Sequence, residues 1–360
     1  MAYRTPAQVQ AFLDDTTHRF DGPAQYLGDE PNSYRKPWDQ STARWLIAAS
    51  WAYEAAAGNS SVPAVYKAIN IGRDDFLCDR FYLPATPRDL KLLESGGIPI
   101  FGIESKHQAR DFDVFATSIA YPILIMSFVK MLKMSDIPVR WRDRERAPET
   151  YPMIIVGGQT YGAPEVLSPI ADAIWCGEVE DEPGNPGIAA VTARISDLKR
   201  LNLWQTDRIE CYRMLAREFN FLYFPRFIDV HYGTEDRGIE HPSKQVVSYT
   251  SNLEGMRLPI TKRIVKDMDA RVPLDNPPLL YADPGMGAGD IEVARGCPAW
   301  CSFCALTYRQ KPYRQSSVEF LTQYAKRMHI NSGSTGITPF SPDFPMYAQK
   351  KALIKSLLTV

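Results

Sequence analysis

The chain has 360 residues, of which 45% are hydrophobic, so it is long enough to bury the cores of two domains. Its 41 basic and 42 acidic residues leave a formal net charge of −1, which excludes a globally basic protein built to bind nucleic acid or anionic membranes. The first residues include acidic side chains and no apolar run, which argues against a secretory or transit signal, and we expect a cytoplasmic protein.

The first predicted unit, residues 1–97, is a helical N-terminal region. An alanine- and tryptophan-rich stretch predicts a helix over 43–57. Apolar residues at helical spacing predict a second helix over 62–68, and a proline after a turn predicts a short third helix over 87–94.

The second predicted unit, residues 98–200, alternates strands with helices, which predicts a Rossmann-like α/β domain with a parallel sheet. The apolar stretch 116–132 carries several polar residues and is short for a membrane span, so it is predicted to be a strand followed by a helix. The predicted strands are 113–119, 139–141, 153–156 and 173–176, and the predicted helices are 123–134, 164–171 and 188–201.

Residues 201–289 are predicted to connect this domain to another unit. A helix over 206–219 and short strands over 221–232 and 245–249 lead into a Pro- and Gly-rich linker, 274–289. Residues 290–360 then begin a second β/α series, with a strand over 291–295, a helix over 317–329, a strand over 336–340 and a helix over 346–358.

Three of the six cysteines lie on one short loop that follows a predicted strand. They are Cys297, Cys301 and Cys304, in the order Cys-Pro-Ala-Trp-Cys-Ser-Phe-Cys. Three thiolates so placed can hold three irons of a [4Fe–4S] cluster and leave the fourth iron open. The alternatives are a zinc site that lacks its fourth ligand, or three unrelated cysteines.

The cysteine spacing, the aromatic Phe303 before the third cysteine, and Arg295-Gly296 before the first resemble the radical S-adenosylmethionine enzymes. The resemblance implies a radical SAM (β/α) barrel starting at residue 290, a [4Fe–4S] cluster on the three cysteines, and reductive cleavage of S-adenosylmethionine. It also implies that Phe303 packs beside the adenine, and that residues after the second barrel strand hold the methionyl amine. Ser341 and Asp343 stand there without the family's Gly-Gly-Glu pattern, and a plain turn is the alternative.

The upstream domain resembles the cobalamin (B12)-binding-type domain that precedes the barrel in one subgroup of these enzymes. The residues that carry this resemblance are Gly157-Gly158 and the Gly-Glu-x-Glu sequence from Gly177 to Glu180. Glycines at strand ends let a bulky ligand approach the backbone, so Gly157, Gly158, Gly177 and Glu178 are candidate cofactor-binding residues. The alternative is that these glycines only end strands. None of the five histidines lies in the Asp-x-His-x-x-Gly context that often ligates cobalt. Cobalamin, the possible second cofactor, would therefore have to bind without a protein histidine, or the domain keeps the fold and has lost the ligand.

Other candidates carry less information. Cys78, Cys176 and Cys211 are scattered along the chain, which is typical of buried apolar cysteines, and we assign them no role. Arg309, Lys311 and Arg314 follow the cysteine loop and are predicted either to pair with an anionic substrate or to form a solvated charged stretch. Nucleic-acid binding is not indicated.

Roughly 60 residues follow Cys304, enough for about two β/α units of about 30 residues each, whereas the resembled barrel has about six. We therefore expect a partner chain to complete the barrel, and a flavodoxin or ferredoxin to supply electrons. The leading hypothesis is a radical SAM enzyme, with cobalamin-assisted methyl or methylthio transfer favoured by the domain pair and with an unknown substrate. The alternatives are a non-catalytic Fe–S or interaction subunit and an electron-transfer or zinc-binding module.

Overall fold

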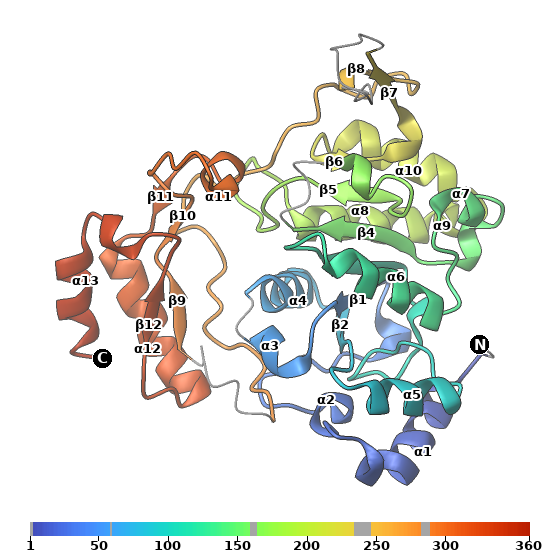
Figure 1. The fold of residues 1–360 in the computed structure, drawn as a ribbon, viewed down its shortest axis with the longest axis horizontal. Helices are drawn as coiled ribbons and strands as arrows, with labels where there is room; N and C mark the ends of the chain where they lie inside the picture. The colour runs from blue at the N-terminus through green and yellow to red at the C-terminus, as the bar shows by residue number, and fades with distance from the viewer. Residues whose placement is uncertain (1–2, 58–59, 159–163, 234–245, 282–288) are drawn as a thin grey trace, which may run out of the picture.

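A computed structural model describes residues 3–57, 60–158, 164–233, 246–281 and 289–360. Figure 1 shows a sheet-bearing body coloured blue to yellow and a separate C-terminal segment in orange and red, connected by an extended linker. Among the described residues, no helix combines the length and the apolar character needed to cross a bilayer.

A six-stranded sheet in the order β2-β1-β3-β4-β5-β6 forms the body. The first five strands are parallel to one another, and β6 pairs antiparallel with β5. This order places β1 between β2 and β3, where the winding of a doubly wound fold reverses. The strands are β1 (Ala43–Ala49), β2 (Phe76–Tyr82), β3 (Val114–Ser118), β4 (Met153–Gly157), β5 (Ala173–Trp175) and β6 (Leu222–Tyr223). The predicted Rossmann-like α/β fold is confirmed.

The helix predicted over 43–57 is wrong for most of its length. Residues Ala43–Ala49 form β1, and the short helix α3 (Tyr53–Ala57) follows after a turn. Alanine favours helices, but a parallel strand covered on both faces is also continuously apolar, and β1 is buried along almost its whole length. Strand β2, which is buried at every position, also lies in the region predicted to be helical. The sheet therefore starts before residue 98.

Two further predicted elements are absent from the described structure. The strand predicted over 139–141 is replaced by the short helix α7 (Trp141–Arg144). The helix predicted over 164–171 is reduced to a single 3-10 turn, Pro164–Val166, followed by turns. Both segments are short, and a few apolar residues cannot by themselves distinguish a strand from a helical turn.

The helices connect the strands and cover the sheet. Helix α4 follows β1 and α3 in the chain, and it packs on β1, on β2 and on α8. The other predicted helices are confirmed with boundaries shifted by a few residues. The body contains α1 (Pro6–Thr16), α2 (Ala24–Leu27), α4 (Ser61–Gly72), α5 (Pro87–Ser95), α6 (Leu124–Met134), α8 (Ile188–Arg200), α9 (Leu203–Thr206) and α10 (Arg208–Glu218).

An antiparallel hairpin of β7 (Ile228–Tyr232) and β8 (Val246–Ser251) extends from the body (Figure 1). The chain beyond it forms a second, smaller core. Strands β9 (Asp290–Glu292) and β12 (Thr338–Phe340) pair in parallel, with α12 (Val318–Ser332) between them in sequence, as the predicted second β/α series requires. Helix α13 (Lys350–Leu357) packs on α12. Strands β10 (Ala294–Arg295) and β11 (Arg314–Gln315) and helix α11 (Ala305–Arg309) surround the cysteine loop.

Candidate functional site

A cavity of about 250 Å³ lies at the carboxyl ends of the parallel strands, where doubly wound folds bind ligands. Its walls are largely apolar, with Trp45, Ile155 and Trp175 among them. Thr117 and Ser118 at the end of β3 add polar groups. The first turn of α4 borders it as well. A mostly apolar hollow with a few converging polar groups is the usual form of a small-molecule site.

The four residues predicted to bind a cofactor in this domain all line the cavity: Gly157, Gly158, Gly177 and Glu178. Gly158 has a φ of +99°, and a Cβ added there would lie 2.5 Å from the carbonyl oxygen of Ile119. A side chain at this position would therefore strain the backbone and crowd the end of β3. The two glycine motifs lie together at the carboxyl ends of β4 and β5, because these two strands are adjacent and parallel.

Gly177 joins the sheet to the linker. Its φ is +114°, and it pairs as an isolated parallel bridge with Arg263. The backbone N–H of Arg263 donates to Cys176, and the N–H of Glu178 donates to the carbonyl of Arg263, at 2.8 and 3.0 Å. A Cβ on Gly177 would lie 2.0 Å from that carbonyl oxygen. Glycine at this position therefore allows the linker to run directly against the end of β5.

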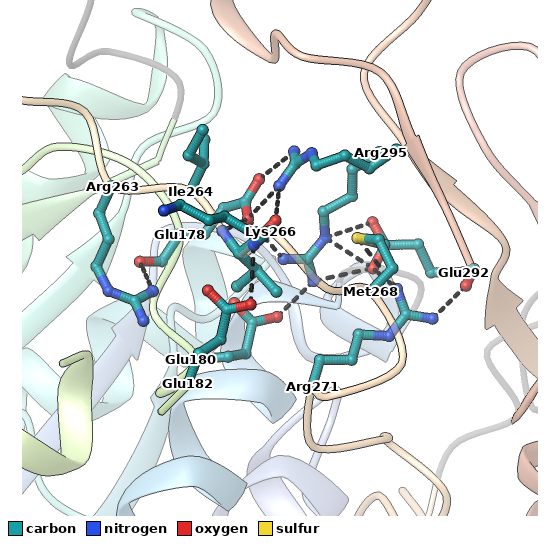
Figure 2. Close-up of polar contacts among 12 residues, drawn as sticks. Glu178, Glu180, Glu182, Arg263, Ile264, Lys266, Met268, Arg271, Glu292 and Arg295 are labelled. Atoms are coloured by element: carbon teal, nitrogen blue, oxygen red, sulfur yellow. Dashed lines mark hydrogen bonds and ion pairs between the residues drawn. The ribbon is translucent and has the colours of Figure 1, made fainter. Parts of the chain in front are cut away.

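Beyond Gly177, three glutamates and three arginines form an ion-pair cluster at the mouth of the cavity (Figure 2). Glu178 and Glu180 come from the end of β5, and Glu292 ends β9. Arg295 contacts all three carboxylates, with Nη1 3.3 Å from Glu178 and Nη2 2.9 Å from Glu292. The two remaining arginines are Arg271, which pairs with Glu292 at 3.2 Å, and Arg314, which pairs with Glu178 at 2.7 Å.

The charges hold one another ionised. Burial raises the pKa of Glu180, but the neighbouring Arg295 guanidinium outweighs it and lowers the pKa to about 2. Burial also acts to raise the pKa of Glu178, and hydrogen bonds from Arg314 together with the charge of Arg295 lower it overall. Burial acts to lower the pKa of Arg295, whereas Glu180 and Glu292 raise it well above its ordinary value. The three glutamates and three arginines of the cluster therefore balance one another's charge at neutral pH.

The same ion-pair cluster lies between two cavities. A second cavity of about 240 Å³ lies against the C-terminal segment and shares Glu180, Glu292 and Arg295 with the first. Arg271, Asp290 and Tyr324 line its other side. The ion pairs thus lie between the carboxyl ends of the strands in the body and the ends of β9 and β12.

A short strand pair joins the two ends of the cysteine loop, and hydrogen bonds within the loop stabilise it. Arg295 and Arg314 are direct partners in the antiparallel β10–β11 pair, so the chain leaves and returns at one place. Gly296 has a φ of +80°, and a Cβ there would lie 2.7 Å from the carbonyl oxygen of Gln310. Within the loop, the Cys304 N–H donates to the Cys301 carbonyl at 3.1 Å, and Thr307 donates to the Ala299 carbonyl at 2.6 Å.

The three loop cysteines are free and partly exposed, which is the state that metal ligation needs. In the described part of the chain, no three His, Cys, Asp or Glu side chains converge closely enough to hold a metal ion. The three thiols are nevertheless the donor type that an iron–sulfur cluster takes, and they share one short anchored loop, so they would have to draw together on binding. Binding of a cluster by these residues stays a prediction.

The remaining predicted residues lie near this loop. Phe303 is 90% exposed. The Ser341 hydroxyl is buried without a hydrogen-bond partner among the described residues, just after β12. Burial raises the pKa of Tyr313, and Asp343 and Cys297 act in the same direction. The roles of Phe303, Ser341 and Asp343 toward S-adenosylmethionine stay predictions.

Some functional residues were not predicted. Arg295 was predicted only as part of the motif, and Arg314 was predicted either to pair with a substrate or to be solvated, whereas both side chains bind Glu178. The polar pair Thr117-Ser118 at the end of an apolar strand was a usable signal for the cavity. No sequence signal identified Lys262, which donates to the carbonyls of Arg309 and Lys311 at 2.8 and 2.6 Å and so supports the loop.

The three scattered cysteines are buried in the body, as expected of small apolar residues. Burial raises the pKa of Cys176 to about 12 and that of Cys211 to about 11, so both remain thiols at neutral pH. Lys311 does not extend freely into solvent, because its ammonium lies 3.4 Å from the centre of the Trp300 ring. Tyr308 packs edge-on against the same ring.

Comparison with known proteins bears on the body of the fold. Residues 61–225 match the family model described as radical SAM proteins, N-terminal. No curated protein matches the chain. Two structures of the radical S-adenosylmethionine methyltransferase TsrM from Kitasatospora setae are similar at 10% identity, each over 88% of this chain and 51% of that chain. One has cobalamin and a [4Fe–4S] cluster bound (TM-score 0.49), and the other has tryptophan substrate and a SAM analogue bound (TM-score 0.44). The chain thus spans about half the length of these solved structures.

The chain has a doubly wound α/β body with a cavity at the carboxyl ends of its strands and an attached cysteine loop. Residues 61–225 carry the match to the family model of the N-terminal region of radical SAM proteins. The matched segment runs from the first turn of α4, through the glycine motifs that line the cavity, to the strand β6. The resemblance to radical SAM proteins predicted from the sequence is confirmed.

Proposed function

We propose that this chain is the cofactor-binding part of a radical SAM enzyme, with a [4Fe–4S] cluster on Cys297, Cys301 and Cys304. The observation that carries the proposal is the placement of the loop. Its two flanking residues, Arg295 and Arg314, are ion-paired to the end of β5, which borders the cavity of the family-matched domain. A cluster with an open iron, when bound, supplies the electron that cleaves S-adenosylmethionine.

The chain's own residues do the positioning. The three cysteines would bind the irons as thiolates, and the short β10–β11 pair fixes where the loop begins and ends. The aromatic Phe303 is free to pack against an adenine because it is 90% exposed. The Ser341 hydroxyl and the Asp343 carboxylate, which follow β12, would accept hydrogen bonds from the methionyl amine.

Anaerobic reconstitution with iron and sulfide, followed by reduction with dithionite in the presence of S-adenosylmethionine, tests this proposal. We expect 5′-deoxyadenosine to form with the reconstituted chain and not with a Cys297→Ala variant. A reconstituted cluster that cleaves no S-adenosylmethionine would favour the non-catalytic subunit instead. Zinc in place of iron would favour the zinc-binding module.

We further propose that the sheet-edge cavity takes part of a cobalamin and that the enzyme transfers a methyl or methylthio group. The support is chemical: Gly157, Gly158 and Gly177 leave open backbone beside largely apolar walls, which suits a flat macrocycle. Among the described residues lining the cavity there is no histidine, so cobalt would be bound without a protein imidazole. The substrate stays open.

Retention of hydroxocobalamin tests the cavity directly. Ala64 lies on α4 and lines both this cavity and the second one, so Ala64→Trp should obstruct both without breaking the helix. The control is Ala7→Trp on the exposed face of α1. We expect the wild type and the control to carry bound cobalamin through gel filtration and Ala64→Trp to lose it. Equal retention by all three would place cobalamin elsewhere, and no retention by any would exclude it.

A further inference from the structure

We propose that Glu178 is a positioning residue that fixes the base of the cysteine loop to the carboxyl end of β5. We call this contact the clamp. Its two carboxylate oxygens are both engaged. Arg314 binds them with two parallel hydrogen bonds, Nη2 to Oε1 at 2.7 Å and Nη1 to Oε2 at 2.9 Å. The Oε2 atom also accepts from the Val265 N–H at 2.6 Å and lies 3.3 Å from Arg295 Nη1.

The arrangement at the loop base explains why a carboxylate is needed there. Arg295 and Arg314 are directly opposite each other on the antiparallel pair β10–β11. Like charges at such positions repel, because their side chains stand on one face about 5 Å apart. Both side chains are largely buried, with exposed fractions of 16% and 9%, so solvent screens the repulsion poorly. Glu178 contacts both guanidiniums and offsets that repulsion.

The clamp also connects two parts of the molecule that are distant in sequence. Glu178 follows Gly177, which pairs with Arg263 in an isolated bridge just beyond β5, and its own N–H donates to the Arg263 carbonyl. Figure 2 shows Glu178 beside Arg263 and Arg295. Its partners are the residues just before Gly296 and just after Tyr313, the two ends of the loop that carries the cysteines. A ligand that fills the sheet-edge cavity therefore lies against the residue that sets the position of the loop. Glu178, predicted as a cofactor-binding residue, lines the cavity and is also bonded to Arg295 and Arg314.

Hydrogen–deuterium exchange in the metal-free full chain tests the clamp. In Glu178→Gln, we expect peptides covering 293–316 to exchange about tenfold faster than in wild type, because two buried guanidiniums then face each other without their shared carboxylate. Peptides of the six-stranded sheet should not change. The matched control is Glu182→Gln, since Glu182 accepts from the Lys266 and Asp267 amides at 2.9 Å each and leaves the clamp intact. Unchanged exchange in 293–316, or an equal rise throughout the body, would overturn the inference.

A double variant tests the cause. In Glu178→Gln/Arg314→Gln the opposed charge is removed as well, so exchange in 293–316 should fall back toward the wild-type rate. Faster exchange than in the single variant would show that Glu178 does not act by offsetting the two arginines.

The inference rests on the proposed function where it concerns the cluster. After reconstitution, a chelator should strip iron several-fold faster from Glu178→Gln than from wild type or Glu182→Gln. Equal rates would overturn the clamp's role toward the cluster. Failure of the wild type to take up iron would overturn the proposed function, while the exchange experiment on metal-free protein would still decide whether Glu178 clamps the loop.

Discussion

Six free cysteines share this chain, and burial divides them into two sets. Cys297, Cys301 and Cys304 are partly exposed on one loop, whereas Cys78, Cys176 and Cys211 are buried among apolar side chains. A thiol must lose its proton to bind iron, and burial in apolar surroundings opposes that loss. The environment of each cysteine therefore supports the division that the sequence spacing predicts.

At the loop, Cys301→Ala should abolish cluster binding, because two thiolates cannot hold the cube. The matched control is Cys211→Ala, which removes a buried thiol far from the loop in sequence. Iron per chain after anaerobic reconstitution is the measurement. Similar iron loss from both variants would remove the assignment of the loop as the ligand set.

Glu180 gives a prediction about pH. Its folded pKa of about 2 lies below the ordinary value of 4.5, so its ion pair stabilises the fold above pH 4.5. That stabilisation, on the order of a few kcal/mol, is lost as the pH falls from 4.5 toward 2. We expect the wild type to lose more stability than Glu180→Gln between pH 5 and pH 3, measured by urea unfolding. Parallel pH profiles of the two proteins would contradict the ion pair with Arg295.

At the scale of elements, the junction between β5 and the linker depends on one glycine. Gly177→Ala should lower the free energy of unfolding by roughly 2 kcal/mol or more, because it adds a Cβ into the Arg263 backbone at a positive φ. Gly184 also has a positive φ, of +71°, but a Cβ there would meet no atom within 4 Å. Gly184→Ala should therefore cost clearly less in the same denaturant titration, and equal losses would show that contact with Arg263 is unimportant.

Much of the fold could be predicted from the pattern of the chain. The parallel strands β3, β4 and β5 end in polar or glycine residues after apolar runs, and the helices α4, α6, α8 and α12 have helical spacing. Strand β1 could not, because its alanines suit a helix until the neighbouring strands and helices cover both of its faces. Tertiary contacts, and not local helix propensity, therefore determine that β1 is a strand.

The site was predicted in parts and not as a whole. The glycines and cysteines carry local signals, namely strand-end position and spacing. The ion-pair cluster that joins them does not, because Glu178, Glu292 and Arg314 are spread over more than a hundred residues and meet only in the folded chain. Charged residues of this kind are as common on solvated surfaces, so sequence alone gives no reason to pair them.

At the scale of the whole molecule, the linker is tied to both the body and the C-terminal segment. Asp275 accepts from Lys67 on α4 at 2.6 Å and pairs with Arg327 on α12. The Asn331 side chain adds a hydrogen bond to the Asp275 carbonyl at 3.1 Å. One carboxylate thus connects a helix of the matched family domain to a helix of the segment that carries the cysteines.

Asp275→Asn should loosen the C-terminal segment, since Lys67 is largely buried and would lose its charged partner. Limited proteolysis should then cleave the linker faster, by about tenfold for a loss near 1.4 kcal/mol. The control is Asp197→Asn, which breaks a half-exposed pair with Arg200 that contributes little. Cleavage at the same rate in wild type and both variants would contradict the connecting role of Asp275.

The central claim is that three cysteines of this chain hold a cluster with an iron open to S-adenosylmethionine. Electron paramagnetic resonance of the reconstituted, dithionite-reduced chain, recorded with and without S-adenosylmethionine, tests it most directly. We predict a reduced [4Fe–4S] signal that changes when S-adenosylmethionine is added and is absent from the Cys297→Ala/Cys301→Ala/Cys304→Ala variant. An iron-free protein, or a cluster signal that S-adenosylmethionine leaves unchanged, would contradict the account.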